Sequence, residues 1–599
     1  AVTVARDDLG VPVIEGESKL DVYRGQGFVH AQERYFQMDL ARRYAAGRLA
    51  ELIGPPVVNM DRRMRPHRFQ QVAEAVIERL TDEQRAELDA YAAGVNAGLE
   101  ALGAAPPEYM LLRMTPEPWE ATDSMLVVLS MFDQLHYNLV LEKRLAVMAD
   151  ALPQELYDLL TPLTTRFDAP LLPQFGEPDY MPATIPGPDV VNLREGNGDE
   201  VDSEQPGEVG AHPIEDDWLA ARWRDGAVGS NNWAVAKEKS AHGGAIVAND
   251  PHLGFTSPGI WYRVQLQWPG RRIVGASLPG LPGIVLGSNG KIAWGVTNTT
   301  ADFQDLILIE VDPDDPNRYL VPEGGWETFG ERMEIINVVG GQPVEMTLQT
   351  TRWGPVYDTD HRGRPRVLKW VAREPAMLDL NLLGMMEMDE LEGAVDLLRQ
   401  SGGPSQNYVL ADEEGRIAWV VSGHLPWRRG FDGSVPVSWA EPGVGWRGEF
   451  GPEQRPYIVN PFELILYTAN NRTVDATRAR ELGNLWAAAH RAARIKDLLT
   501  RQMTFDERDM LGVQLDNRVA VLDYHRGELL RVIPEDIDDP VLALARRAVA
   551  EWNETSDADQ VGMAVLHRYR STLQRKLIDP LVAPCRALDS SFSYLWFRD

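Results

Sequence analysis

The chain has 599 residues, of which 44% are hydrophobic and 25% charged, as in soluble globular proteins with more than one hydrophobic core. Its formal net charge of −30 repels nucleic acid phosphates, so we expect no nucleic-acid binding. The single cysteine, Cys585, excludes disulfides within the chain, and the eleven histidines contain no HExxH pattern. We find no uninterrupted apolar run of about 18 residues, which predicts no membrane span.

The first third of the chain is dominated by helical patterns. Residues 1–16 are typical of an extended hairpin, and residues 21–52 show helical periodicity that ends at Gly54-Pro55-Pro56. Further helical patterns cover residues 69–102 and 124–151. These segments predict a helix-rich lobe.

The character of the chain changes twice after this lobe. Residues 182–228 are rich in Gly, Glu, Asp and Pro and poor in aromatic residues, which is typical of a linker or an excised segment. From residue 230 the apolar period becomes two, and short strands alternate with Gly, Pro and Asn turns to about residue 370. Helices return from about residue 486. The last residues carry no terminating signal, so a missing C-terminal segment is one interpretation.

The boundary between the linker and the strands carries a candidate nucleophile in the sequence GSNNWAV, residues 229–235. Ser230 has neither a GxSxG elbow nor an SxxK motif around it. A serine that becomes N-terminal through cleavage of the preceding bond uses its own α-amine as the base, and the pKa of such an amine is about 7.7–8.0. Gly229 suits the strained backbone that attack on its carbonyl would require. A plain turn is the alternative interpretation.

Seven strings of the chain together resemble the penicillin acylase family of N-terminal nucleophile hydrolases, in that family's order and at about its spacing. The strings are RDDLGVPVI, GFVHAQERYFQMDLARRYAAGRLAEL, GSNNWAV, ANDPHLG, GSNGKIAWGVTNTTADFQDL, TANNR and HRAARI. The resemblance implies an α+β fold, an αββα four-layer sandwich with a helix-rich small-subunit lobe. It also implies one precursor that is cut into a small (alpha) subunit, residues 1–189, a removed linker, residues 190–229, and a large (beta) subunit, residues 230–599.

The resemblance further implies how the nucleophile is generated. Ser230 matches the catalytic nucleophile, which acts with its own amine after cleavage between Gly229 and Ser230. His252 matches a position whose backbone carbonyl accepts a hydrogen bond from that amine, so its imidazole need not take part in catalysis.

Three later residues match the family's stabilising groups. Asn298 matches the position that donates its main-chain N–H to the oxyanion hole, and Asn470 matches the side-chain amide of the same hole. Arg491 matches an arginine that orients the site beside that amide. Outside this context the two asparagines are typical of turns, and the arginine is typical of a solvated helix face.

A calcium site is implied by the string TTADFQDL. Asp302 and Asp305 match carboxylate ligands, Gln304 matches a main-chain carbonyl ligand, and Glu142 supplies a carboxylate from the first lobe. Hard oxygen ligands suit Ca²⁺, which would tie the two subunits together structurally. Solvated acidic residues in an acidic protein are the alternative. No organic cofactor is expected.

The acyl pocket is expected beside the nucleophile. By position, Leu253, Leu286 and Val296 should line it, with Phe132 and His136 reaching in from the helical lobe. An apolar lining favours a hydrophobic acyl group, although ordinary core packing explains the same residues. Leu253 stands where phenylacetyl-preferring members have an aromatic residue, which argues against benzylpenicillin as the preferred substrate.

The sequence therefore predicts a self-processing amidohydrolase of the penicillin acylase type. Its substrate would be a small N-acyl amide, such as a β-lactam antibiotic. The amide bond that holds the acyl side chain would be cleaved through an acyl-enzyme on Ser230. An acyl-homoserine-lactone or lipopeptide acylase of the same fold is the alternative, and an inactive binding homologue a further one. The resemblance implies a periplasmic or secreted protein, with a cytoplasmic location left open because residues 1–16 do not resemble a signal peptide.

Overall fold

The structure is a computed structural model that describes residues 1–136, 138–172, 180, 182–192, 229–254, 256–484 and 486–595. Most of the predicted linker lies outside the described residues, because residues 193–228 do not belong to these ranges. The division of the chain into a small subunit, a removed linker and a large subunit therefore stays a prediction.

A nine-stranded sheet forms the centre of the molecule, in the strand order β1-β2-β5-β6-β7-β8-β17-β18-β22. Neighbouring strands are antiparallel except β2 and β5, which pair in parallel through residues 13–15 and 265–267. The predicted N-terminal hairpin is thereby part of a sheet whose other strands follow residue 260. The strands are Val2–Arg6 (β1), Pro12–Gly16 (β2), Tyr262–Trp268 (β5), Arg271–Ser277 (β6), Leu286–Ser288 (β7), Ile292–Asn298 (β8), Gln406–Asp412 (β17), Ile417–Val421 (β18) and Tyr457–Val459 (β22).

A second sheet of three strands packs face to face against the large one. Its central strand is β3 (Gly229–Val235), which pairs with β23 (Ile465–Thr468) on one side and with β4 (Ile246–His252) on the other. Because side chains alternate along a strand, Ala234 faces β17 and β18 of the large sheet, whereas Trp233 and Val235 face the opposite way. Ser230 is therefore the second residue of the central strand of a layer that is covered on both faces.

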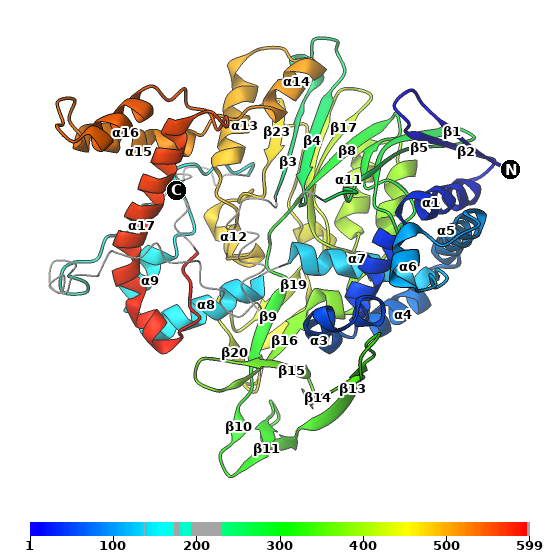
Figure 1. Ribbon diagram of the computed structural model, residues 1–599, viewed down its shortest axis with the longest axis horizontal. Coiled ribbons are helices and arrows are strands. Elements are labelled where there is room, and N and C mark those ends of the chain that lie inside the picture. The colour runs from blue at the N-terminus through cyan, green and yellow to red at the C-terminus, as the bar shows by residue number, and fades with distance from the viewer. Residues whose placement is uncertain are drawn as a thin grey trace.

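Helices cover the outer face of each sheet. α1 (Lys19–Ala46), α5 (Asp82–Ala101) and α11 (Leu391–Gln400) lie on the large sheet, and α13 (His490–Arg501) and α14 (Glu507–Gln514) lie on the small one. Figure 1 shows the resulting order of helix, sheet, sheet and helix. The predicted α+β fold with an αββα sandwich is confirmed.

The helix-rich lobe is present, but the first predicted helix is too long. The helix predicted over residues 21–52 ends at Ala46, because Gly47 adopts a left-handed conformation, with φ at 64°, and caps it. A short helix, α2 (Ala50–Ile53), follows. The helical patterns over residues 69–102 form two helices, α4 (Phe69–Arg79) and α5, since Thr81 caps the start of the second.

The apolar pattern over residues 124–151 also forms two helices, α7 (Ala121–Leu135) and α8 (Asn138–Ala151). By length and composition, Ala121–Ala151 could cross a membrane, but 82% of its most apolar window is buried inside the protein. Such burial is typical of a core helix, so the apolar composition is explained by packing. α17 (Val561–Leu588) lies beside α8 and shares a hydrophobic cluster with it.

The remaining elements project from the sandwich (Figure 1). A six-stranded sheet in the order β13-β14-β15-β16-β9-β20 and a three-stranded sheet of β10, β11 and β12 form the lower part of the view. These strands are Gln304–Leu308 (β9), Val311–Asp312 (β10), Asp315–Leu320 (β11), Trp326–Thr328 (β12), Gly330–Ile336 (β13), Val344–Thr351 (β14), Gly354–Thr359 (β15), Pro365–Trp370 (β16) and Val437–Ser438 (β20).

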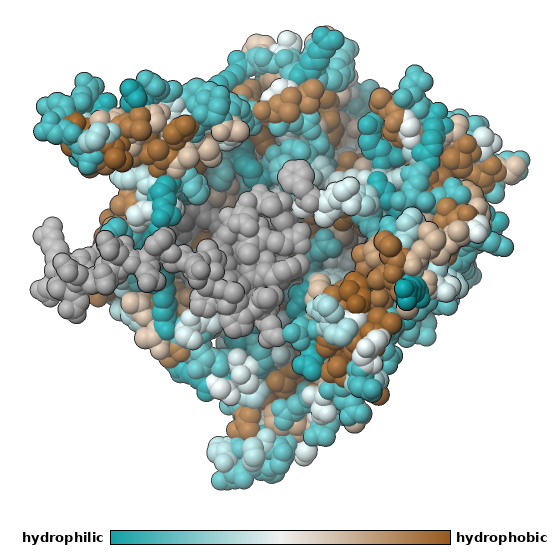
Figure 2. All heavy atoms as spheres, viewed as in Figure 1, coloured by the Kyte–Doolittle hydropathy of each residue, from teal (hydrophilic) through white to brown (hydrophobic). Residues whose placement is uncertain are grey.

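The helices near the C-terminal end of the described chain leave apolar side chains at the surface. α15 (Asp523–Val532) and α16 (Pro540–Ala550) pack with α17, and they expose Val532, Val541 and Leu544. Figure 2 shows this apolar surface over α15 and α16 at the upper left. The packing of these helices on one another therefore leaves part of their apolar surface uncovered by described residues.

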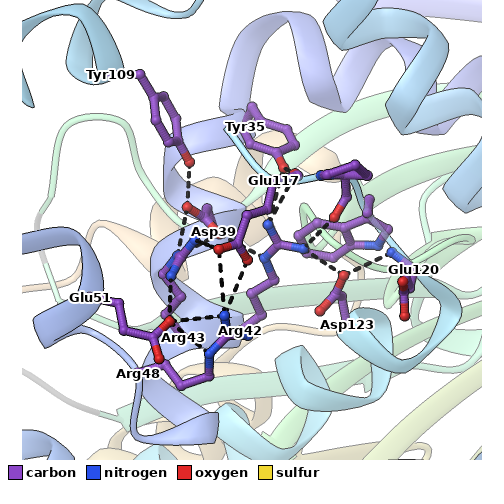
Figure 3. Close-up of polar contacts among 12 residues, drawn as sticks. Tyr35, Asp39, Arg42, Arg43, Arg48, Glu51, Tyr109, Glu117, Glu120 and Asp123 are labelled. Carbon is purple, nitrogen blue, oxygen red and sulfur yellow. Dashed lines mark hydrogen bonds and ion pairs between the residues drawn. The ribbon is translucent and has the colours of Figure 1, made fainter. Parts of the chain in front are cut away.

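A buried ionic network explains the string MDLARR in α1. Asp39 is fully buried and accepts hydrogen bonds from Nε of Arg42 at 2.7 Å, from Nε of Arg43 at 3.0 Å and from the hydroxyl of Tyr109. Nη1 of Arg42 also donates to Asp123, at 2.6 Å, on α7 (Figure 3). Burial alone would raise the pKa of Asp39, but the two guanidinium groups outweigh it and lower that pKa below its usual value. The network joins α1 to the segments that cover it.

Replacing Asp39 tests whether this network holds the lobe together. Asp39→Asn removes the negative charge that Arg42 and Arg43 share, and we expect a loss of about 3–5 kcal/mol in the free energy of unfolding. Urea unfolding at pH 7 measures it. The matched control is Glu528→Gln, which removes an exposed pair with Arg531 and should leave the unfolding midpoint nearly unchanged. Equal effects of the two substitutions would contradict a structural role for the network.

Candidate active site

Ser230 is held on three sides by hydrogen bonds. Its backbone N–H donates to Oδ1 of Asn470 at 2.7 Å, and its carbonyl accepts from Nη1 of Arg491 at 2.8 Å. Its hydroxyl donates to the carbonyl oxygen of Gly229 at 2.7 Å. The hydroxyl oxygen therefore lies against the carbonyl group that self-cleavage would attack, and the nitrogen that cleavage would release already has a hydrogen-bond acceptor.

Asn470 connects this serine to the large sheet. Its backbone lies in the left-handed region, with φ at 63°, which asparagine tolerates better than most residues. Its Oδ1 accepts from Ser230 and from Nη2 of Arg491 at 3.0 Å, and its Nδ2 donates to the carbonyl of Asn298 at 2.9 Å. Asn298 in turn donates from Nδ2 to the carbonyl of Leu135, the last residue of α7, at 2.7 Å. The structure thus brings together the four residues Ser230, Asn298, Asn470 and Arg491, whose catalytic roles stay predictions.

Arg491 also explains why position 229 is a glycine. A Cβ atom on Gly229 would lie 3.0 Å from Nη2 of Arg491 and 3.3 Å from Oδ1 of Asn470. Gly229 is an ordinary residue of β3, and its φ does not lie in the left-handed region. The φ of Gly229 therefore gives no sign of the expected strained backbone, and a side chain at this position would press on Arg491 and Asn470.

The backbone of His252 lies beside the start of β3, but the Ser230 N–H donates to Asn470 and not to the His252 carbonyl, so the role that the resemblance implies for this carbonyl stays a prediction. In the register of β3 and β4, His252 lies directly opposite Gly229. Its Nε2 is hydrogen-bonded to Oδ2 of Asp250 at 2.9 Å, and this bond lowers the pKa of the Asp250 carboxyl. The imidazole of His252 therefore contacts a carboxylate of its own strand.

Sequence reasoning missed the residue that joins the two sheets beside the nucleophile. Asn249 donates from Nδ2 to the carbonyls of Asn231 at 2.8 Å and of Val296 at 2.9 Å, and its Oδ1 accepts from the N–H of Val296 at 3.0 Å. Asn249 belongs to the string ANDPHLG, so its presence in that string was the available signal. The amide of Asn249 ties the start of β3 to β8.

An apolar cavity of about 170 Å³ opens beside Ser230. Leu253 and Val296 line it, as predicted. Leu286 does not, because alternation along its strand leaves the adjacent Val285 at the cavity wall instead. The cavity is also lined by residues from the helical lobe and from the loop before β17, among them Val128, Met131, Leu135, Leu383 and Pro404.

Phe132 and His136 are likewise not at the cavity wall. The face of α7 that lines the cavity carries residues 128, 131 and 135, so residues 132 and 136 point to a neighbouring face. His136 stacks on Phe303 with a ring-centre distance of 4.2 Å and accepts at Nδ1 from Nε1 of Trp370 at 3.0 Å. Burial lowers the pKa of His136 to about 3, so its ring is neutral at physiological pH. Both side chains belong to the core.

The predicted metal ligands gather around an arginine. Asp302 and Asp305 are buried and contact Arg428, at 3.1 Å and 2.9 Å respectively, while Glu142 accepts from the N–H of Leu306 with both carboxylate oxygens. Gln304 uses its Oε1 to accept from the N–H of Leu139 at 3.1 Å. Two buried carboxylates therefore contact one guanidinium group, and the charge of the third, Glu142, also acts on it. Within the ranges that the structure describes, no three acidic or histidine side chains converge as a metal site does.

Burial dominates the titration of these carboxylates. It raises the pKa of Asp302 to about 8 and that of Glu142 well above the usual value, with the neighbouring Asp305 adding to the rise at both positions. Arg428 lowers the pKa of Asp302 and of Glu142, but it does not offset burial at either. Burial thus favours the protonated, neutral forms of Asp302 and Glu142 over their charged forms.

Comparison with known proteins places the chain in a family. A family model described as penicillin amidase matches residues 1–597. The acyl-homoserine lactone acylase QuiP of Pseudomonas aeruginosa is 31% identical over 86% of this chain and 60% of its own length. The penicillin acylase 2 proenzyme of a Pseudomonas species is 30% identical over 96% of this chain and 71% of its own length. A thermostable penicillin G acylase structure from Alcaligenes faecalis superposes with a TM-score of 0.48, at 22% identity, over 55% of this chain and 60% of that chain.

The family match covers the described residues on both sides of the predicted linker. The chain spans about 60% of the length of the acyl-homoserine lactone acylases that it matches. The penicillin G acylase of Escherichia coli is 27% identical over 84% of this chain and 63% of its own length. Because the family model extends over nearly the whole chain, and a relative 30% identical is matched over more than two thirds of its length, the chain belongs to the penicillin amidase family.

Proposed function

We propose that this chain is a self-processing amidohydrolase that cuts itself between Gly229 and Ser230. The observation that carries the proposal is the hydrogen bond from the Ser230 hydroxyl to the Gly229 carbonyl, at 2.7 Å, in a position that Asn470 and Arg491 fix. Attack of the hydroxyl oxygen on that carbonyl, transfer of the acyl group to oxygen and hydrolysis of the ester would leave Ser230 with a free α-amine. By family relation we also propose a periplasmic or secreted location.

The same residues would then hydrolyse a substrate amide. The α-amine of Ser230 takes the proton of the hydroxyl, whose oxygen attacks the substrate carbonyl. The negative charge on the carbonyl oxygen is stabilised by the N–H of Asn298 and by Nδ2 of Asn470. Nδ2 carries two hydrogens, so it can keep its bond to the Asn298 carbonyl while it donates the second one to the oxyanion. The amine leaves with a proton, and water releases the acid from the serine ester.

The cavity limits the acyl group that fits. Its volume of about 170 Å³ is close to the roughly 150 Å³ of an apolar cavity that holds benzene, so a phenyl ring or a chain of about six carbons fits. A β-lactam antibiotic with such a side chain and a short N-acyl homoserine lactone both satisfy this limit. The similarity to acyl-homoserine lactone acylases supports the second as the alternative.

The reading of the chain as an inactive binding homologue receives no support from the site. The nucleophile, both predicted oxyanion residues and the orienting arginine are present and in contact with one another. A scaffold without catalysis does not require this set of contacts.

We further propose that the carboxylates of Glu142, Asp302 and Asp305, with the main-chain carbonyl of Gln304, bind one calcium ion. The chemistry of the set fits, since buried carboxylates outnumber the nearby Arg428 by three to one and hard oxygens suit Ca²⁺. The ion would supply positive charge between α8 of the first lobe and the strands after residue 300. The side chains would have to move closer together, because Arg428 now lies between Asp302 and Asp305.

Cleavage is tested by sequencing the N-terminus of the purified protein. We expect a second N-terminus that begins Ser-Asn-Asn-Trp, and a single uncut chain for Ser230→Ala. Gly229→Val should slow the cut strongly while the protein stays folded, because its side chain collides with Arg491 and Asn470. Gly259→Val is a matched control at a position with open space. A Ser230→Ala protein that is still cut at residue 230 would contradict the proposal.

Substrate class is tested with the processed protein and a panel of N-acyl amides. Release of acid is measured for phenylacetyl, glutaryl, hexanoyl and dodecanoyl amides of 6-aminopenicillanic acid and of homoserine lactone. We expect phenylacetyl and hexanoyl compounds to react and dodecanoyl compounds to react at least about 100-fold more slowly, because the cavity is short. Ser230→Ala should release no acid. Fastest turnover of the dodecanoyl compounds would overturn the size limit, and no turnover at all would overturn the enzyme function.

Calcium binding is tested by thermal unfolding. We expect addition of CaCl₂ to raise the midpoint of unfolding and a chelator to lower it, since a ligand that binds only the folded state stabilises it in proportion to RT ln(1 + [L]/Kd). Glu142→Gln should abolish the calcium-dependent shift. Asp150→Asn, at a partly exposed site in the same helix, is the control. Midpoints that do not respond to calcium would overturn the proposed calcium site.

A further inference from the structure

The loop that carries Asn470, residues 469–474, is braced by the two residues that follow it in the string TANNR. Asn471 is fully buried, and its Oδ1 accepts from the N–H of Ala469 at 2.9 Å while its Nδ2 donates to the carbonyl of Arg472 at 2.9 Å. One amide group therefore ties the residue before Asn470 to the residue two positions after it. Because the backbone of Asn470 is left-handed, with φ at 63°, this brace limits where its side chain can point.

Arg472 anchors the loop to a distant part of the chain. Its Nη2 and Nε donate to Oδ2 of Asp168 at 2.6 Å and 3.2 Å, and its Nη1 donates to the carbonyl of Val474 at 2.6 Å. The side chains of Asp168 and Arg472 are only 5% and 3% exposed. A buried ion pair of this kind stays closed, because either charge without the other is costly in the interior.

The partner of Arg472 belongs to a segment, residues 165–172, that packs against the outer face of the small sheet. The N–H of Leu171 donates to the carbonyl of Thr473, inside the loop, at 2.8 Å. Ala169 is 3% exposed and belongs to the same hydrophobic cluster as Trp233 of β3. The segment is thus docked beside the loop, and it precedes the predicted linker in the chain.

We propose that Asp168 and Arg472 are positioning residues that hold Nδ2 of Asn470 in place for the oxyanion. The inference rests on the proposed amide hydrolysis, and it makes the oxyanion hole depend on the docking of residues 165–172. The contacts run from Asp168 through the guanidinium and carbonyl of Arg472 to the amide of Asn471, whose Oδ1 holds the residue before the oxyanion donor. After the proposed cut, this ion pair would join the small subunit to the large one.

Kinetics of the processed protein test the positioning. Asp168→Asn leaves Arg472 without its counter-ion. With the p-nitroanilide of hexanoic acid we expect kcat to fall about 10- to 100-fold and KM to stay within about twofold, because a misplaced donor weakens contacts that the transition state makes more strongly than the substrate. Asp168→Glu keeps the charge and should retain a higher kcat than Asp168→Asn.

Inhibition by pentylboronic acid reports on the oxyanion hole directly. The Ser230 oxygen forms a bond to boron, the hydroxyl proton passes to the α-amine, and the resulting tetrahedral boronate is negatively charged like the reaction intermediate. We expect the inhibition constant in Asp168→Asn to rise by the factor by which kcat/KM falls. The inhibition constant of 1-pentanol, which forms no oxyanion, should not change. A loss of active molecules alone would lower kcat and leave both inhibition constants as they are in the wild type.

Two further variants separate positioning from stability. Asp39→Asn removes another buried carboxylate that two arginines share, and it should lower the urea midpoint without changing kcat or the boronate inhibition constant. The double variant Asp168→Asn with Arg472→Met leaves no unpaired charge in the interior, so it should fold even where Asp168→Asn does not. We expect the double variant to keep the lowered kcat and the raised inhibition constant.

Hydrogen exchange distinguishes failure of this inference from failure of the proposed function. If the wild type neither cuts itself nor hydrolyses the anilide, the hydrolase function fails, and the positioning is then read from the exchange of residues 469–474. These amides should exchange at least about 10-fold faster in Asp168→Asn and in the double variant than in the wild type or in Asp39→Asn. Wild-type kcat and boronate inhibition in the folded double variant, or wild-type exchange where no activity exists, would overturn the inference.

Discussion

The hydrogen bond from the Ser230 N–H to Oδ1 of Asn470 fixes how the residues of the candidate active site lie relative to one another. It fixes the first residues of β3, the middle strand of the small sheet, which must lie flat against the large sheet for the sandwich to close. Arg491 holds the same amide oxygen from α13, on the outer helical layer, and Nδ2 of the same side chain reaches the end of β8. One asparagine thus links three of the four layers at a single point, and a left-handed backbone aims its side chain there.

Sequence patterns predicted the layers better than the ends of their elements. Period-two alternation identified β3, and the order of seven strings identified the residues that meet at Ser230, because local sequence and family order both constrain these positions. The break at Gly47 was missed because the helical periodicity resumes directly after it. Phe132 and His136 were predicted to line the cavity because of their position in the sequence of the helical lobe. Which face of α7 turns inward depends on packing against Phe303 and Trp370, far away in sequence.

Charge and polarity in the interior were the least predictable features. The string around Asp302 and Asp305 indicated oxygen ligands, but nothing in it pointed to Arg428, which comes from a strand more than 120 residues later and now contacts both carboxylates. In the sequence, Gln406 and Tyr408 are typical of ordinary strand residues. Only the structure shows that their neighbour Asn407 is satisfied on the other face while they border an apolar cavity. Such pairings arise between distant segments, and a linear pattern carries no information on them.

The parallel pairing of β2 with β5 determines how a cleaved molecule would have to refold. Before the cut, these strands belong to one chain, and their meeting is an internal event favoured by a high effective concentration. After the proposed cut between Gly229 and Ser230 and the proposed loss of the linker, the same sheet would be shared by two separate polypeptides. An unfolded mature molecule would have to reassemble in a concentration-dependent encounter of two chains. Its lifetime would then rest on how slowly it unfolds, and only the precursor would fold in a unimolecular step.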